Sequence, residues 1–340
     1  MKDKHFNYEK VLALIFLILF VIFLIYLNLN KPRIFIVHSY DTDYSWVVDI
    51  NIGLNRIFQK YSYNIRYYYM NTKRNPDKNY IEKVGNSVIK MIKDWEPDIL
   101  IAIDDNAQEY VAKHFINNPK MKIIYSGVNA NPQIYGYDKA NNVTGILERL
   151  PFNAFKEVFL QILPPDKRRI MHIADASETS YFIQKEIEEL NWYPLILKKT
   201  ILCKTIQDWN NAIEYSQQNA DILFITHYHT IKDNHGIVIK PSKIIELTES
   251  KLKIPAIGSW GFFVEDGGMM AVAVSPYEQG EEAAKIAVEI LEKKHDIQNI
   301  KPIVSRLFVI YIRKDSIIRR NLKLPTLIEA FAKATNNFYE

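Results

Sequence analysis

The sequence contains a single cysteine, Cys203, so neither an intramolecular disulfide nor a cysteine-based metal cluster is available to it. It also lacks the GxSxG, GxxxxGK[ST] and GxGxxG patterns, which removes the usual signatures of serine hydrolases, P-loop proteins and dinucleotide-binding proteins. Because Cys203 lies near the end of a predicted strand, we interpret it as a small core residue rather than a nucleophile.

Runs of like charge are also missing. The net charge is only +4 and no five consecutive residues share one sign, so no nucleic-acid partner is expected. With 48% hydrophobic and 24% charged residues, the chain has enough apolar material for two lobes with their own cores, and disorder is excluded.

One long hydrophobic run is present, VLALIFLILFVIFLIYL at residues 11–27. As a helix it would span roughly 26 Å, close to the hydrocarbon core of a bilayer. Lys2, Lys4 and Lys10 precede it, which favours a cytoplasmic N-terminus. A cleavable signal peptide is the alternative, but the exit IYLNLNKPR lacks a small-residue cleavage site. We therefore expect a single-pass anchor in the cytoplasmic membrane, in contact with lipid, and a soluble domain on the extracytoplasmic side.

Beyond residue 30, β-branched runs alternate with amphipathic segments, which is typical of parallel sheets covered by helices. Strands are expected near residues 33–38, 64–69, 98–103, 121–126, 169–174, 195–202, 221–226, 254–258, 271–274 and 305–311. Helices are expected near residues 44–60, 78–95, 105–117, 152–163, 178–190, 205–219, 241–251, 276–294 and 325–335. Asp43 and Ser275 stand where they would cap two of these helices.

A weak internal repeat organises these elements. KPRIFIVHSYD is echoed by KRRIMHIADAS, EPDILIAIDDNA by NADILFITHYHT, and KMKIIYSGVNA by LKIPAIGSWGF. The repeat predicts an α/β fold of two similar Rossmann-like lobes with parallel sheets and a ligand cleft between them, preceded by one transmembrane helix. We assign residues 1–30 to the cytoplasmic tip and anchor, residues 31–148 and 273–304 to lobe I, and residues 149–272 and 305–340 to lobe II.

Polar residues follow the predicted strands at corresponding places in both halves. Ligands of open parallel sheets bind beyond the carboxyl ends of the strands, near the N–H groups of helix N-termini. The expected ligand-binding residues are Ser39, Tyr40, Asp41, Trp46, Asp105, Asn106, Gly127, Asn129, Asp175, Ser177, His227, Tyr228 and Trp260. Helix amides suit a carboxylate, aspartates suit an ammonium and the aromatic residues suit an apolar or cyclic body, so a zwitterion or a small polar ring is expected.

Several of these residues have a structural alternative. Trp46 is equally well explained as a core aromatic, Asp43 is better explained as a cap than as a ligand contact, and Asp105 is explained by either binding or capping. A zinc or copper site at His227, His229 and His235 is a weaker alternative to histidines in a loop, with one of them lining the cleft. Asp104 and Asp105 are adjacent and point apart in extended chain, which is poor geometry for a catalytic pair. No catalytic residue, metal or cofactor is therefore expected.

The order of five segments carries a family resemblance. PDILIAIDDNAQEYV, IIYSGVNANPQIYGY, NVTGIL, IPAIGSWGFFVEDGGMMAVAVSPYEQGEEAAKIAVEIL and LPTLIEAFAKA together resemble the ABC-transporter substrate-binding proteins of the tryptophan/tyrosine type, over roughly residues 33–335. HSYDTDYSW is similar to the opening of a subgroup that often serves as extracytoplasmic sensor domains.

The resemblance implies the type I periplasmic binding protein fold, with two lobes that close on a small molecule. It also implies ligand contacts from the turn at residues 105–107, from residues 127–129, and from His227 and Trp260. We therefore expect a membrane-anchored, extracytoplasmic solute-binding protein without enzymatic activity, which delivers its ligand to a membrane permease of the ABC type. The alternative is a receptor domain that signals to a membrane protein without transport; an enzyme would need a base and a nucleophile that no motif announces.

Overall fold

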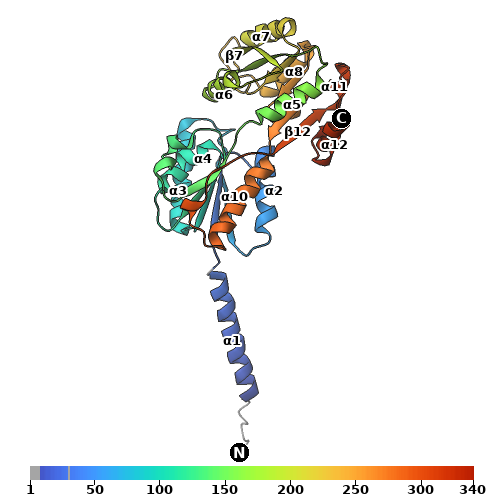
Figure 1. Cartoon of the computed structure of the whole chain (residues 1–340). Coiled ribbons are helices and arrows are strands. Elements are labelled where there is room, and N and C mark those ends of the chain that lie inside the picture. The colour runs from blue at the N-terminus through green and yellow to red at the C-terminus, as the bar shows by residue number, and fades with distance from the viewer. Residues whose placement is uncertain (1–7, 30) are drawn as a thin grey trace, which may run out of the picture. The chain divides into compact units, whose positions relative to one another are not determined.

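The computed structural model describes residues 8–29 and 31–340, and its chain forms two compact units (Figure 1). Unit 1 comprises Met1–Ser126, Pro132–Gly145 and Gly280–Lys301; unit 2 comprises Gly127–Asn131, Ile146–Gln279 and Pro302–Glu340. The sequence placed the corresponding borders at residues 148, 272 and 304. Residues 1–7, which belong to the cytoplasmic tip expected before the anchor, lie outside the described residues.

The first sheet has the strand order β11-β5-β4-β3-β1-β2. Unit 1 contains β1, β2, β3 and all but the last two residues of β4. β1 pairs in parallel with β2 and β3, and β3 pairs in parallel with β4. This sheet and the helices around it comprise β1 (Arg33–His38), α2 (Ser45–Phe58), β2 (Asn64–Tyr69), α3 (Lys78–Trp95), β3 (Ile99–Ile103), α4 (Asp105–Tyr110), η1 (Ala112–Phe115), β4 (Lys122–Val128), η2 (Pro132–Tyr135), η3 (Tyr137–Lys139), β5 (Val143–Leu147), α10 (Pro276–Leu291), η4 (Ile297–Asn299) and β11 (Ile303–Val304). By the unit borders, β11, the end of β5 and the start of α10 belong to unit 2.

The core of unit 1 forms because alternate residues of each strand point to opposite faces of the sheet. Phe35 and Val37 of β1 pack with Val88 and Ile92 of α3 in one buried cluster. α2 and α10 approach each other so closely that a Cβ added to Gly280 would lie 2.1 Å from the carbonyl oxygen of Ile50, so this position requires glycine.

Unit 2 contains a second sheet with the order β13-β12-β10-β9-β8-β6-β7, which is parallel except for the antiparallel pair β10–β12. Its elements are α5 (Phe152–Ile162), β6 (Arg169–Asp175), α6 (Glu178–Glu189), β7 (Ile196–Cys203), α7 (Ile206–Asn219), β8 (Ile222–Ile225), α8 (Pro241–Lys251), β9 (Ala256–Gly258), α9 (Phe262–Glu265), β10 (Met270–Val274), β12 (Phe308–Arg313), α11 (Lys314–Arg319), α12 (Thr326–Ala334) and β13 (Phe338–Tyr339). Cys203 is fully buried in this core and burial raises the pKa of its thiol to about 12, which agrees with its expected role.

The strand orders explain the internal repeat. In the first sheet β4, β3, β1 and β2 follow one another, and in the second sheet β9, β8, β6 and β7 do so. The repeat matches β1 with β6, β3 with β8 and β4 with β9, so each matched strand holds the same place in its sheet. The two α/β halves predicted from the repeat are therefore confirmed.

Most predicted elements begin and end within three residues of the observed ones, but short elements were missed. β11, β13, α9 and α11 have no counterpart in the prediction, because two to six residues carry too little periodicity. The capping role predicted for Asp43 is wrong: α2 has Tyr44 as its N-cap residue without a side-chain cap, and Asp43 pairs with Arg74 instead. The cap at Ser275 is confirmed, since its Oγ accepts the backbone N–H of Glu278.

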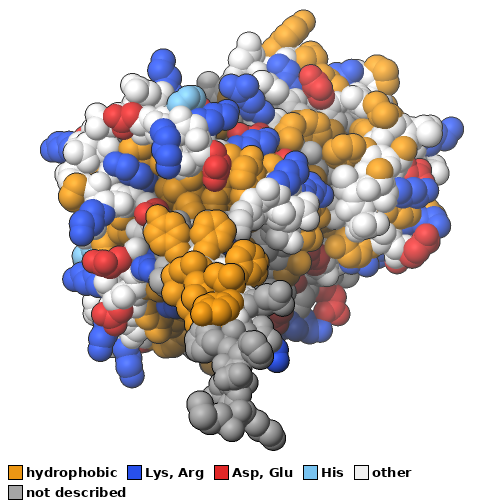
Figure 2. All heavy atoms as spheres, turned by 90° about the horizontal axis from the view of Figure 1, so that it is seen from below, with side chains coloured by type: hydrophobic (Ala, Val, Ile, Leu, Met, Phe, Trp, Pro, Cys, Tyr) orange, Lys and Arg blue, Asp and Glu red, His pale blue; other side chains and the backbone are white. Residues whose placement is uncertain are grey.

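The N-terminal helix α1 covers Tyr8–Leu29. Among the residues that the structure describes, no helix qualifies as long and apolar enough to cross a membrane, so the predicted transmembrane helix is not supported. The apolar side chains of α1 are nevertheless exposed, from Val11 at 37% to Phe16 at 70%. Figure 2 shows hydrophobic side chains gathered at the front of the face where this helix points toward the viewer.

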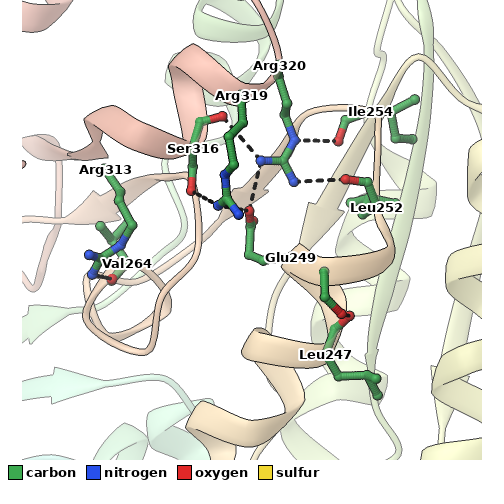
Figure 3. A network of polar contacts seen from close by, with 10 residues as sticks. Leu247, Glu249, Leu252, Ile254, Val264, Arg313, Ser316, Arg319 and Arg320 are labelled. Carbon is green, nitrogen blue, oxygen red and sulfur yellow. Dashed lines mark hydrogen bonds and ion pairs between the residues drawn. The ribbon is translucent and has the colours of Figure 1, made fainter.

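The C-terminal part of unit 2 is held by a network of arginines (Figure 3). Arg320, after α11, donates to the carboxylate of Glu249 on α8 over 2.8 Å and to the carbonyls of Leu252 and Ile254. The side chains of Arg320 and Glu249 are only 5% and 6% exposed. Arg319 reaches the same carboxylate over 3.4 Å, but its side chain is 56% exposed.

Candidate functional site

In unit 1, the expected site residue Ser39 fastens the carboxyl ends of β1 and β3 together. Its Oγ donates to the carbonyl of Ile103 and accepts from the backbone N–H of Ala107, both over 2.8 Å. Its own carbonyl accepts the hydroxyl of Thr72 over 2.7 Å. Because Ser39 is fully buried and its hydroxyl is engaged, it shapes the start of α4.

The first residues of α4 carry the next part of this cluster. The amide of Asn106 donates to the hydroxyl of Thr72 over 2.9 Å, and the hydroxyl of Tyr135 donates to the carboxylate of Asp105 over 2.8 Å. Burial, followed by the charge of Asp105, raises the pKa of Tyr135 far above its ordinary value. The N-cap residue of α4 is Asp104 and not Asp105, so the capping alternative for Asp105 is wrong.

Trp46, in the first turn of α2, contacts Asp104, which directly follows β3. Its indole Nε1 donates to the carboxylate of Asp104 over 2.9 Å, and the ring is half-buried. Asp104 has a φ of 66°, a left-handed backbone that non-glycine residues seldom adopt. The indole therefore holds a carboxylate whose backbone is strained at the expected ligand edge.

Asp41, which is buried, and Tyr40, which is half-buried, lie in the loop after β1. Arg74 contacts Asp41 over 3.3 Å and Asp43 over 2.6 Å. Burial and the neighbouring Asp43 raise the pKa of Asp41, whereas hydrogen bonds with Asp41 and Arg74 lower the pKa of Asp43 to about 2. The Tyr40 ring lies 5.2 Å from the ammonium of Lys73, so this loop already pairs its charged and aromatic groups locally.

In unit 2, the centre of the candidate site is Glu148, which the sequence did not identify. Its carboxylate accepts the indole Nε1 of Trp260 over 2.8 Å and the amide of Asn129 over 2.9 Å. The next residue, Arg149, donates to the carbonyls of Val128 and Asn129. These bonds fix the expected ligand residues Asn129 and Trp260 to the strand β5.

The aromatic wall beside Glu148 contains His227, Trp260 and Phe262. The rings of His227 and Trp260 lie 4.3 Å apart, and Phe262 stacks on Trp260 at 5.6 Å. His227 is half-buried, so part of it reaches the surface of unit 2. Tyr228 lies in the core instead: it is fully buried and its hydroxyl donates to Asp266 over 2.7 Å.

Two other expected residues, Asp175 and Ser177, build the start of α6. One carboxylate oxygen of Asp175 accepts the hydroxyls of Ser177 and Ser180, and the other accepts the backbone N–H of Thr230 over 3.0 Å. Burial alone would raise the pKa of Asp175, but these hydrogen bonds outweigh it and the pKa lies below its ordinary value. Ser177 is the N-cap of α6, which gives both residues a structural role.

The expected site residue Gly127 contributes through its backbone. It has a φ of 64°, which favours glycine, and its backbone N–H donates to the side chain of Gln279 over 2.8 Å. Within the described parts of the chain, no group of three His, Cys, Asp or Glu residues could hold a metal ion.

The structure also brings in residues that the prediction omitted. Besides Glu148, these are Thr72 and His172, which is fully buried and contacts Thr226 over 2.9 Å. Glu148 directly follows the NVTGIL segment, but no local pattern marks it as an acceptor for Trp260 and Asn129. Together the two clusters offer hydrogen-bond donors, carboxylates and aromatic faces, which is the chemistry of binding a small polar molecule.

Comparison with known proteins gives one family. The family described as ABC transporter substrate binding protein matches residues 34–335. An uncharacterized protein of Rickettsia prowazekii (strain Madrid E) is 25% identical over 211 residues, and the match spans 61% of each chain.

Solved structures share the fold. A ligand-free, open substrate binding protein with adhesive properties from Clostridium difficile has a TM-score of 0.67 at 15% identity, with 91% of this chain and 98% of that chain covered. The ABC domain in complex with L-Trp from Streptococcus pneumonia has a TM-score of 0.61 at 16% identity, with 89% and 98% covered. The TorS sensor domain–TorT complex has a TM-score of 0.52 at 12% identity, with 87% and 97% covered. The architecture is that of type I periplasmic binding proteins.

Proposed function

This chain belongs to the ABC transporter substrate binding protein family, and from that premise we propose that it captures a small polar ligand, amino-acid-like or cyclic, and delivers it to an ABC-type importer. The observation that carries the proposal is the family match over residues 34–335, which includes both α/β units. Proteins of this family bind substrates and are generally not enzymes. The ligand-binding chemistry of the two clusters agrees with that role.

The ligand class follows from the groups that surround Trp260. The half-buried rings of His227 and Phe262, which pack on Trp260, suit an apolar ring or chain, while Asn129 and Glu148 lie beside the indole edge and suit polar groups. In unit 1, the Asp105 carboxylate at the start of α4 suits an ammonium group. A zwitterion with a small body satisfies each of these groups.

Capture by closure of the two units is part of the proposal. A ligand shifts a population only by the difference between its affinities for the open and the closed arrangement. Small-angle scattering with and without ligand tests this step, and an unchanged radius of gyration on saturation would contradict closure.

The first experiment is a thermal-shift screen of the detergent-solubilised full chain against amino acids, nucleosides, sugars, polyamines and divalent metal ions. A ligand at one hundred times its Kd stabilises the folded state by about 2.7 kcal/mol, which raises Tm visibly. A small-molecule hit establishes binding and names the class. If only zinc or copper raises Tm, His227, His229 and His235 form the binding site instead. If no compound raises Tm, the proposal is rejected for these ligand classes.

A sensor is the second candidate, favoured by the likeness to the TorS sensor domain–TorT complex. In that case the partner is a membrane signalling protein rather than a permease. Neighbouring genes for a permease and an ATPase support transport, whereas a neighbouring kinase or cyclase gene supports sensing.

Attachment to a membrane is a separate part of the proposal, and it is argued from surface chemistry. α1 exposes a continuous series of large apolar side chains between Val11 and Tyr26, which is unfavourable in water. Lys2, Lys4 and Lys10 precede the apolar run, which favours a cytoplasmic N-terminus and an extracytoplasmic soluble domain. Carbonate extraction of membranes that contain the full chain tests the anchor, and release of the chain into the supernatant would contradict it.

A further inference from the structure

The turns that precede the strands of unit 1 lie along one edge of its sheet, here named the amino-terminal edge and made of residues 31–33, 59–63, 93–98 and 116–122. Backbone hydrogen bonds bring them together: the N–H of Asp98 donates to Arg33, the N–H of Lys122 donates to Asp98, and the N–H of Asn64 donates to Pro32. β1 begins at Arg33, four residues after α1 ends at Leu29. Four residues of extended chain span at most about 14 Å, so this edge stays close to the end of α1.

Aromatic and basic side chains are combined along this edge. The Arg66 guanidinium lies 4.5 Å from the ring centre of Trp95, and that of Arg33 lies 6.0 Å from it. The rings of Tyr61 and Tyr63 stack at 5.5 Å, and Tyr61 is 39% exposed. Trp and Tyr are the residues enriched at the level of lipid headgroups, where their apolar rings and polar atoms are both accommodated.

A hollow of ≈ 260 Å³ opens on the same edge, between the end of α3 and the segment after η1. Its lining includes the buried side chains of Ile92, Phe115 and Met121. The exposed residues of the same lining are Lys93, Lys120, Glu96 and Asp98, so charges of both signs surround the hollow. A lysine that covers apolar surface with its stem while its ammonium stays in water suits the boundary between acyl chains and phosphate groups.

The two edges of the unit 1 sheet carry opposite charge. The amino-terminal edge has six Lys or Arg residues against three Asp or Glu residues, a net charge of +3. The turns at the opposite edge, residues 39–44, 70–77, 104–106 and 132–137, have two against five, a net charge of −3. An anionic surface therefore attracts the edge next to α1 and repels the edge that carries the candidate ligand residues.

We propose that the amino-terminal edge of unit 1 docks on the surface of a lipid bilayer that carries anionic headgroups. The inference rests on the proposed anchoring through α1 and deepens it. The bilayer is the occupant because α1 keeps this edge within a few residues of the lipid, and because the aromatic residues, the apolar floor of the hollow and the net positive charge of the edge all match a headgroup layer. Docking leaves the opposite edge, with Asp105 and Asn106, directed away from the lipid.

Position-specific quenching tests the docking in liposomes that contain the full chain. An environment-sensitive fluorophore is attached to Tyr61→Cys, and the quencher is a lipid spin-labelled at its headgroup. The matched control is Ile134→Cys, a 65% exposed position of unit 1 on η2, at the opposite edge. The wild-type chain, whose Cys203 is buried, is the labelling blank. We expect at least threefold stronger quenching at position 61 than at position 134, and equal quenching would overturn the proposal.

Charge reversal separates docking from anchoring. Lys93→Glu with Lys120→Glu reverses the net charge of the amino-terminal edge, and Lys78→Glu with Lys83→Glu makes the same charge change elsewhere on the exposed face of α3. We expect the first pair to reduce quenching at position 61 to the level found with neutral lipids, and the second pair to leave most of it. A chain that does not float with liposomes overturns both proposals. A chain that floats but shows no preferential quenching at position 61 overturns the docking alone and points to a protein partner for this edge.

Discussion

The indole Nε1 of Trp260 donates to Oε1 of Glu148 over 2.8 Å, although 112 residues separate them in the sequence. Both residues are almost fully buried, and the bond fixes the indole edge so that its face lies 4.3 Å from the ring of His227. The orientation of the aromatic wall in unit 2 therefore depends on one carboxylate.

We expect Trp260→Ala to weaken ligand binding at least tenfold, because it removes the central aromatic face of the wall. Asp105→Ala should also weaken binding, through the loss of a carboxylate at the start of α4. Calorimetric titration with the ligand found by the screen measures both. Trp209→Phe is the control: Trp209 donates to Thr248 within the core of unit 2, so its replacement should lower Tm and leave Kd unchanged. Unchanged affinity in both site variants would reject the site.

Glu148→Ala should destabilise unit 2 by about 1–3 kcal/mol, since it leaves the donors of Trp260 and Asn129 without this acceptor in a buried environment. Glu148→Gln retains an oxygen acceptor and should cost less. Denaturant unfolding of the two variants measures the difference. Equal stability of both with the wild type would show that Glu148 does not hold the indole in solution.

Strand ends are local features, which explains why the sequence placed His227 and Trp260 just after the strands now seen as β8 and β9. The repeat placed both at the ends of matched strands, and the strand orders of the two sheets agree with it. Glu148 was missed because its role depends on where β5 ends relative to Asn129 and Trp260, which no local pattern encodes. Tyr228 shows the same limit: it is next to His227 in sequence, yet it is fully buried and its hydroxyl donates to Asp266, a contact that no local pattern encodes.

The hydrogen-bonded carboxylate of Asp175 predicts a loss of stability in acid. Its pKa is below the ordinary value of 3.8 in the folded state, so the unfolded state binds the proton more readily. The stabilisation is present above about pH 4 and is lost as the pH falls through the lowered value. Asp175→Asn should lower the free energy of unfolding at pH 7 and flatten its decline below pH 4. If the free energy of unfolding of Asp175→Asn declines below pH 4 as steeply as that of the wild type, this role of Asp175 is contradicted.

His172 predicts a different pH window. Burial lowers its pKa to about 3, with a further lowering by His227, against an ordinary value of 6.5. Between about pH 3 and pH 6.5 the imidazole of His172 is protonated in the unfolded state but not in the folded state. The free energy of unfolding therefore falls as the pH drops below about 6.5. The contribution reaches roughly 1.4 kcal/mol per pH unit. We expect His172→Gln to reduce the difference in unfolding free energy between pH 7.5 and pH 5.5. His235→Gln, in an exposed turn, should leave that difference unchanged.

The pair Arg320 and Arg319 offers a matched test of buried and exposed charge, because both contact Glu249. Arg320→Ala leaves the Glu249 carboxylate buried without its main partner and removes the donors to the carbonyls of Leu252 and Ile254. The free energy of unfolding should therefore fall by about 3–5 kcal/mol. Arg319→Ala removes a mostly exposed side chain and should cost at most about 1 kcal/mol.

A double variant separates the worth of the ion pair from the penalty of breaking it. Arg320→Met with Glu249→Leu replaces both charges with apolar side chains, so no unpaired charge remains in the interior. It should regain a large part of the stability lost in Arg320→Ala, because the desolvation cost of both ions disappears together with their attraction. Denaturant unfolding measures all three variants. If the double variant is as unstable as Arg320→Ala, the loss lies in the bonds from Arg320 to the backbone after α8 and not in the orphaned carboxylate.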